Sequence, residues 1–170
     1  LTNATTEKGA SNASGALAAL SEKNADNLKS VAHALNTAIS VRSQPAKAVR
    51  LLSALATLAS NGKVAQEAVT QDTTVFSSLV SWLTTPSKDV QVQATRVLLA
   101  LASNNPSSQA LLGANGCIPP VVKLLEIKYV EPGVYEAQEY AACTIWHLAG
   151  IKKNRDIIFS AQAVVPLVQM

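Results

Sequence analysis

The chain repeats itself at an interval of a little over 40 residues, and this recurrence limits its fold more than any other feature. The segment Leu58–Asn61 (LASN) recurs 43 positions later as Leu101–Asn104, and a related segment, Leu148–Ile151 (LAGI), follows after a further 47. Apolar residues at spacings of three and four precede each copy, which is the pattern of one helix face. A unit of this size cannot bury its apolar faces alone, so we expect successive units to stack into a solenoid.

The composition favours helices. Of the 170 residues 48% are hydrophobic, mostly Ala, Leu and Val, with two Trp, two Phe and three Tyr. Small and unbranched side chains suit close helix packing. Alternating Val, Ile, Thr and Tyr, the signal of a half-buried strand, is absent. The sequence therefore predicts an all-α domain.

Clusters of Pro, Gly and Asn divide the chain into helices of two lengths. We predict helices at about 25–41, 46–60, 74–83, 88–103, 117–125, 134–149 and 163–168, with shorter ones at 17–20, 64–70, 107–112 and 154–159. This grouping gives a loop or frayed segment at 1–16, a divergent repeat at 17–60, repeats at 61–103 and 104–150, and the start of another at 151–170. Because the chain begins with Leu and stops inside an apolar pattern, we expect a fragment of a longer array.

The connector at residues 126–135 is about four residues longer than its counterpart one repeat earlier, which accounts for the interval of 47. It contains Tyr129 and Tyr135, and Pro132-Gly133 supplies a turn. Tyrosine is efficient at interfaces because it combines a large apolar body with a polar tip. Two interpretations stay open: a protruding specificity element, or a lid whose tyrosines pack over its own repeat.

The succession GCIPPVVKLL, EAQEYAACTIWHLA and NRDIIFSAQAVVPLV resembles the armadillo repeat. That family typically begins its second helix with Gly-x-Ile-Pro-Pro-x-Val-x-Leu-Leu and has an Ala-rich third helix. The resemblance is good over 61–170 and looser over 17–60. It implies a right-handed superhelix of three-helix units, whose third helices line a concave groove for extended peptides or partner helices. The residues that carry it are Gly116, Ile118, Pro119, Pro120, Leu124, Leu125, Ala141, Ala142, Leu148 and Ala149.

The resemblance also indicates which side chains would line the groove. With Ala141, Ile145 and Leu148 directed to the core, Tyr140, Thr144 and His147 lie about 100° round the helix, with Cys143 at the edge. Superposing the repeats transfers these positions to the two earlier third helices. The predicted groove residues are Arg50, Ser53 and Thr57, then Gln93, Arg96, Ala100 and Asn104, then Tyr140, Cys143 and His147.

Nuclear-import receptors of this family place a Trp-x-x-x-Asn pair in the groove, to sandwich lysine stems and to hold the peptide backbone. Trp146 lies three positions from that place, on another face of its helix. The pair is missing from every repeat, which argues against a receptor for basic localisation signals. The residues at those positions are Cys143 and His147, Arg96 and Ala100, and Ser53 and Thr57.

Three polar residues leave alternatives open. Arg50 and Arg96 favour an acidic or carboxylate-bearing ligand, because a guanidinium offers a fork of donors; the other interpretation is a pair of solvated surface arginines. His147 either hydrogen-bonds a bound peptide backbone or is a half-buried histidine bonded by a neighbouring repeat.

Trp82 and Trp146 fall at core or inter-repeat spacing, so we expect both to pack. The basic cluster at 152–155 fits an inter-repeat turn.

Other function classes find little support. A net charge of +3 with 15% charged residues is far from the dense basic surface of a nucleic-acid-binding protein. The two cysteines, Cys117 and Cys143, have no metal-ligand spacing and form no disulfide framework, which favours a reducing compartment. No apolar run of about 18 residues is present. Cys143 and His147 are one helical turn apart, but no acid accompanies them, and the usual catalytic motifs are absent.

We therefore predict a non-catalytic scaffold or adaptor without a cofactor, which binds an extended peptide or partner helix in the groove. A cytoplasmic location is expected, with membrane-associated and nuclear sites left open. The alternatives are a divergent nuclear-import-type carrier and, less favoured, an RNA-binding helical repeat, because aromatic residues do not recur at equivalent groove sites.

Overall fold

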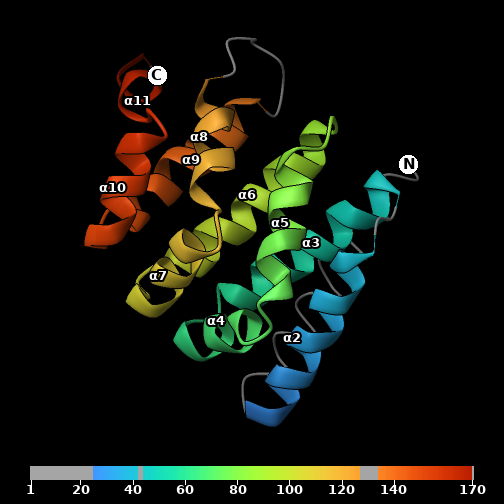
Figure 1. Ribbon diagram of the computed structural model, residues 1–170. Coiled ribbons are helices and arrows are strands. Elements are labelled where there is room, and N and C mark those ends of the chain that lie inside the picture. Colours follow the sequence, from blue (N-terminus) through green and yellow to red (C-terminus); the bar gives the residue numbers. More distant parts are fainter. Residues whose placement is uncertain (1–24, 42–43, 127–133, 170) are drawn as a thin grey trace.

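The computed structural model describes residues 25–41, 44–126 and 134–169, and these ranges form ten α-helices without a β-strand (Figure 1). The predicted all-α fold is confirmed, and each helix begins and ends within about two residues of the predicted one. The segment 1–16 and the short helix predicted at 17–20 lie outside the described residues. The helices are α2 Ala25–Ser40, α3 Pro45–Ala59, α4 Lys63–Thr70, α5 Thr74–Leu83, α6 Lys88–Ala102, α7 Pro106–Ala114, α8 Ile118–Leu125, α9 Val134–Leu148, α10 Lys152–Ser160 and α11 Val164–Gln169.

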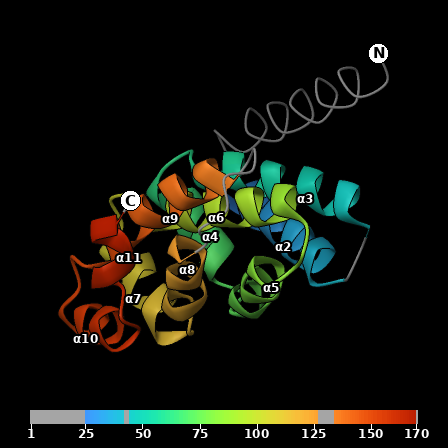
Figure 2. The ribbon, with the colours of Figure 1, turned by 90° about the horizontal axis from the view of Figure 1, so that it is seen from above.

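The helices α3, α6 and α9 form a row in which α6 packs against both of the others. In Figure 2 this row lies along the upper side of the molecule, with α5, α8 and α10 below it. Ten of the 15 residues of α6 are buried, because neighbours cover it on several sides. The arrangement is an α-solenoid of stacked three-helix units.

Buried amide side chains hold the short first helices against the ends of the third helices. Gln66 Nε2 of α4 donates to the carbonyl oxygens of Ala100 at 2.7 Å and Ser103 at 3.0 Å, and its Oε1 accepts from Asn105 Nδ2 at 2.9 Å. Gln109 of α7, 43 residues after Gln66, donates to Ala102 at 2.8 Å. These bonds satisfy carbonyls that a helix leaves unpaired at its C-terminus, and they fix the end of α6.

The two tryptophans have different environments. Trp82 is buried, and its Nε1–H donates to the carbonyl of Ile39 at 2.9 Å, which joins α5 to α2. The prediction that Trp82 packs is confirmed. For Trp146 the same prediction is wrong, since its side chain is 73% exposed. The physical reason is that, within the described residues, α9 has a neighbouring third helix on one side only.

The glycine of the GCIPP motif has a backbone role. Gly116 has φ +75°, and the Cys117 N–H donates to the Leu112 carbonyl at 3.1 Å, which ends α7 in a left-handed C-cap. After α10 the Ala163 N–H bonds the Ile158 carbonyl at 3.3 Å, but the residue in the left-handed conformation is Gln162, with φ +60°. A residue with a Cβ is strained there, whereas glycine is not.

We predict that Gln162→Gly stabilises the protein. Relief of the left-handed strain outweighs the added chain entropy of the unfolded state, for a gain of about 0.5–1 kcal/mol in the free energy of unfolding, measured by urea denaturation. Gln71→Gly is the matched control, because Gln71 follows α4 in the right-handed helical conformation and should lose stability. A loss of stability in both variants would contradict the strain at Gln162.

The contact between α10 and α7 depends on a residue without a side chain. Asn154 is buried, and its Nδ2 donates to the Gln109 carbonyl at 2.9 Å. The Asn154 amide occupies the place of a side chain on Gly113, and a Cβ built there would lie 2.6 Å from Asn154 Cγ. Gly113 therefore allows the two helices to approach, with a buried hydrogen bond at their contact.

A double-mutant cycle tests this contact. We expect Gly113→Ala to cost about 1–3 kcal/mol through overpacking, and Asn154→Ala to cost about 0.5–1.5 kcal/mol through the loss of a buried hydrogen bond. The double variant should lose less than the sum of the two, because the new methyl group fills space that the amide has left. Strictly additive losses in urea denaturation would show that the two residues do not compete for one site.

Candidate functional site

The predicted groove residues of α6 lie along one stripe of that helix. Arg96 is exposed and Gln93 is half-buried, whereas Ala100 is only 9% exposed. Gln93 Oε1 is buried and has no hydrogen-bond partner among the described residues. Asn104, just after the helix, is exposed with φ +53°. The stripe is therefore flat at Ala100, where the side chain is small and the carbonyl oxygen accepts a hydrogen bond from Gln66. The guanidinium of Arg96 projects from the stripe.

The neighbouring third helices continue this stripe. On α3 Arg50 is exposed, while Ser53 and Thr57 are half-buried. On α9 Cys143 is exposed, and Tyr140 and His147 are half-buried. The predicted positions thus reach the surface on all three helices, except for Ala100. Whether they bind a partner stays a prediction.

Tyr140 and Arg96 show that α6 and α9 face a common surface. The Tyr140 hydroxyl donates to Glu136 Oε1 at 2.9 Å. Burial is the main cause that raises the pKa of Tyr140, the bond to Glu136 adds to it, and the positive charge of Arg96 opposes both. The charge of Arg96 thus acts on the phenol of Tyr140 across the boundary between adjacent repeats.

Neither groove arginine is used in an ion pair within the described residues. The ion pairs found there join Lys29 to Asp26, His33 to Asp72 and Lys63 to Glu67. Those pairs are near the outer helices α2 and α4. Arg50 and Arg96 therefore keep their charge available for an acidic ligand.

The ring of His147 makes no hydrogen bond in the part of the chain that the structure describes. It lies 4.6 Å from the ring of Trp146, at an interplanar angle of 57°. Burial lowers the pKa of His147, so at neutral pH the ring has one N–H donor and one nitrogen acceptor. The bond from a neighbouring repeat, one of the two interpretations of this residue, is not found. The ring can instead meet both the N–H and the C=O of a peptide backbone.

One side chain assigned to this face is misplaced by the sequence argument. Thr144 is fully buried, and its Oγ1 donates to the Tyr140 carbonyl at 2.6 Å. The helical period indicates which residues of α9 share a face, but it does not indicate how many of them a neighbouring helix covers. The neighbouring helix α6 covers more of α9 than a single apolar stripe indicates. The sequence argument also missed Glu136 and Glu139, which are exposed at the start of α9. Glu136 lies in the first turn of α9, where the helix dipole favours a carboxylate, and this was the available signal.

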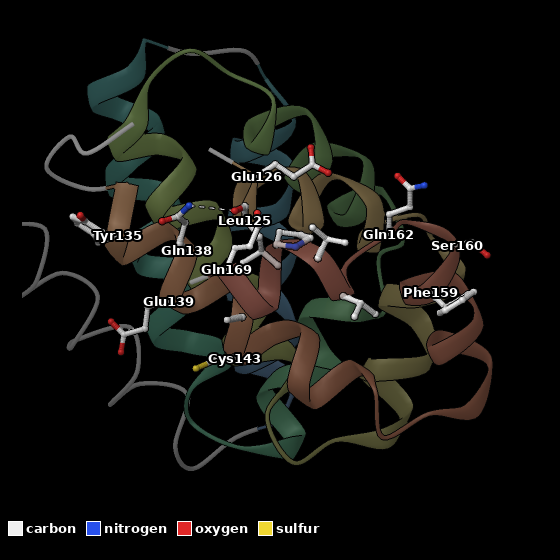
Figure 3. Close-up of a pocket in the computed structure, with 14 residues that line it drawn as sticks. Leu125, Glu126, Tyr135, Gln138, Glu139, Cys143, Phe159, Ser160, Gln162 and Gln169 are labelled. Carbon is white, nitrogen blue, oxygen red and sulfur yellow. Dashed lines mark hydrogen bonds between the residues drawn. The ribbon is translucent and has the colours of Figure 1, made fainter. Parts of the chain in front are cut away.

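Part of the tyrosine connector is described. Tyr135 is exposed in the first turn of α9, and Glu126 follows the end of α8 (Figure 3). Tyr129 lies outside the described residues. The choice between a specificity element and a lid therefore stays open.

The two cysteines are unpaired and differ in environment. Cys117 is buried, which raises the pKa of its thiol to about 12, whereas Cys143 is exposed on the groove face. No group of three or more His, Cys, Asp or Glu side chains suited to a metal ion occurs among the described residues. None of the helices in the described ranges is both long and apolar enough to cross a bilayer.

We predict that the two thiols react with a disulfide reagent at very different rates. Since the thiolate is the reactive species, Cys143 should react at pH 8 at least about 100-fold faster than the buried, protonated Cys117. The absorbance of the released chromophore should show that one thiol per chain reacts rapidly in the native protein. The second thiol should react only in denaturant. In Cys143→Ser the rapid phase should vanish. Two rapid equivalents in the native protein would show that α8 opens locally.

Several solved structures with a similar fold are engineered proteins. One is a designed armadillo repeat protein, YIII(Dq.V1)4CPAF, in complex with the peptide (KR)4; it superposes with a TM-score of 0.75 at 21% identity, over 94% of this chain and 66% of that one. Another is the engineered structural genomics target OR366, with a TM-score of 0.75 at 26% identity, over 93% of this chain and 65% of that one. A third, target OR329, has a TM-score of 0.66 at 23% identity, over 93% and 71%.

These comparisons establish the fold. The chain is similar to armadillo repeat proteins in structure, and it spans just under two thirds of the length of the first two. No protein-family model matches the sequence, and no curated protein does. The armadillo-like solenoid that the GCIPP and Ala-rich segments predicted is confirmed.

Proposed function

We propose that the chain is a non-catalytic repeat scaffold that binds an extended peptide along the surface of α3, α6 and α9. The observation that carries the proposal is the row of surface side chains on three successive third helices, α3, α6 and α9, which pack side by side. The designed armadillo protein of the same fold is in complex with a peptide, which supports peptide binding as a function of this fold. Such a stack is rigid, so affinity comes from many modest contacts.

The charges of this row favour acidic side chains in the peptide. Arg50 on α3 and Arg96 on α6 are exposed without an ion-pair partner among the described residues. Guanidinium groups bind carboxylates in a bidentate geometry. The designed protein carries a basic peptide, (KR)4, but this chain lacks the Trp-x-x-x-Asn pairs of the import receptors. We therefore propose a ligand whose acidic residues lie over α3 and α6.

Hydrogen bonds to the peptide backbone would come from α9. The half-buried imidazole of His147 has both a donor and an acceptor at neutral pH. Ala100, at the equivalent place on α6, leaves room for the backbone to approach. As an adaptor of this kind the protein would act in a reducing compartment such as the cytoplasm, which suits its two free thiols.

A peptide-binding experiment with a charge-reversal variant tests the proposal. We expect a labelled glutamate-rich peptide to bind with saturable fluorescence anisotropy and to bind more tightly than (KR)4. Arg96→Glu should weaken the acidic peptide at least about tenfold, which corresponds to about 1.4 kcal/mol. Lys123→Glu, which makes the same charge change on the exposed face of α8, should leave the affinity within about twofold.

The stability of each variant is measured in parallel, since both positions are exposed and should tolerate the change. Tighter binding of (KR)4 than of the acidic peptide would overturn the charge assignment. Equal losses in the two variants would show that net charge, and not the groove, governs binding.

A further inference from the structure

The chain contains two Asn-Gly pairs, and each lies in a turn that follows a helix. Asn61-Gly62 joins α3 to α4, and Asn115-Gly116 joins α7 to α8. Both asparagines are exposed, and both glycines have positive φ, +102° for Gly62 and +75° for Gly116. A glycine has no Cβ to shield its backbone nitrogen, so this nitrogen can attack the side-chain amide of the asparagine before it. In sequence and in exposure the two pairs are equivalent.

The turn after α7 holds both groups that would react. Asn115 Nδ2 donates a hydrogen bond to the Leu111 carbonyl at 2.8 Å, which directs the side chain back along α7. The Gly116 N–H donates to the Gly113 carbonyl at 3.3 Å. A nitrogen can attack only after it has lost its proton, and a hydrogen bond donated by the N–H favours the protonated form. Asn115 is therefore protected although it is exposed.

The turn after α3 leaves the same two groups unbonded. Neither the side-chain amide of Asn61 nor the N–H of Gly62 makes a hydrogen bond with any residue that the structure describes. Other atoms hold this turn: the Asn61 N–H donates to the Leu58 carbonyl at 3.1 Å, and the Gly62 carbonyl accepts from the Gln66 N–H at 3.1 Å. A Cβ built on Gly62 would meet nothing within 4 Å. The space around the glycine is therefore open enough for a cyclic imide.

We propose that Asn61 is a modification site at which the folded protein deamidates without an enzyme, whereas Asn115 stays intact. The Gly62 nitrogen attacks Asn61 Cγ, the bond from Cγ to Nδ2 breaks, and ammonia leaves with the proton of the Gly62 N–H. Water then opens the cyclic imide. Cleavage between the nitrogen and Cγ gives aspartate, and cleavage between the nitrogen and the Asn61 carbonyl carbon gives isoaspartate. The net reaction consumes one water and releases one ammonia, and nothing is oxidised or reduced.

The product places a new carboxylate at the junction of α3 and α4. It lowers the formal net charge of +3 by one. Gly62 is the N-cap of α4, and the first turn of α4 contains no acidic residue, so the positive end of the helix dipole favours the added charge. The folded protein therefore tolerates aspartate here. Asn61 is the counterpart, 43 residues earlier, of the predicted groove residue Asn104, so the charge appears at the edge of the candidate groove.

Peptide mapping by mass spectrometry tests the proposal, with Asn115 as the internal control. The purified chain is incubated at pH 8, and deamidation is followed at each asparagine separately. In the native protein we expect Asn61 to react at least about tenfold faster than Asn115, which corresponds to a difference of about 1.4 kcal/mol between the two barriers. In urea that unfolds the chain, the two rates should agree within about threefold, because the hydrogen bonds of the turn after α7 are then lost.

Two variants complete the test. Asn61→Gln should abolish modification at this turn, because a longer side chain must close a larger ring, and Asn61→Asp should keep the urea midpoint of the parent chain. Equal native rates at Asn61 and Asn115 would overturn the proposal. A preference for Asn61 that persists in urea would overturn its structural cause, and a lowered midpoint in Asn61→Asp would overturn the tolerance of the charge. None of these measurements involves a peptide ligand, so they fail or succeed independently of the proposed groove.

Discussion

The burial of α6 between its neighbours is the interaction on which the rest of the structure depends. A single three-helix unit leaves apolar faces uncovered, and only the next unit can remove them from water. Ten of the 15 residues of α6 are buried for this reason. Because the third helices must lie side by side to achieve this, each can present only a narrow stripe to solvent. The candidate groove is the sum of these stripes.

Buried polar contacts give the stack its register. Apolar stripes alone would tolerate sliding of one helix along another, but an amide that loses its carbonyl in a dry environment is costly. Gln66 and Gln109 bond carbonyls at the end of α6, and Asn154 enters the space beside Gly113. These bonds hold α4 and α7 against the end of α6, and α10 against α7.

Much of this could be predicted from the sequence, and the errors have a common cause. The breaks at Pro, Gly and Asn located the helices, the GCIPP motif placed a left-handed glycine at Gly116, and Trp82 is buried as expected. Trp146 and Thr144 were assigned to the wrong environments. Periodicity identifies which residues share a helix face, but whether a neighbour covers that face depends on the adjacent repeat. Trp146 lies where no described third helix follows, and Thr144 lies where α6 covers more than expected.

The sequence by itself determined the repeating unit, the helical class and the polar residue types on each third helix, because these depend on local propensity and on the spacing of apolar residues. Only the tertiary structure decided which of those residues are accessible and which meet. It exposed Arg96, buried Thr144 and left the imidazole of His147 without a hydrogen bond among the described residues. The physical reason is that the exposure of a side chain depends on how two repeats pack together, and not on the sequence of one segment alone.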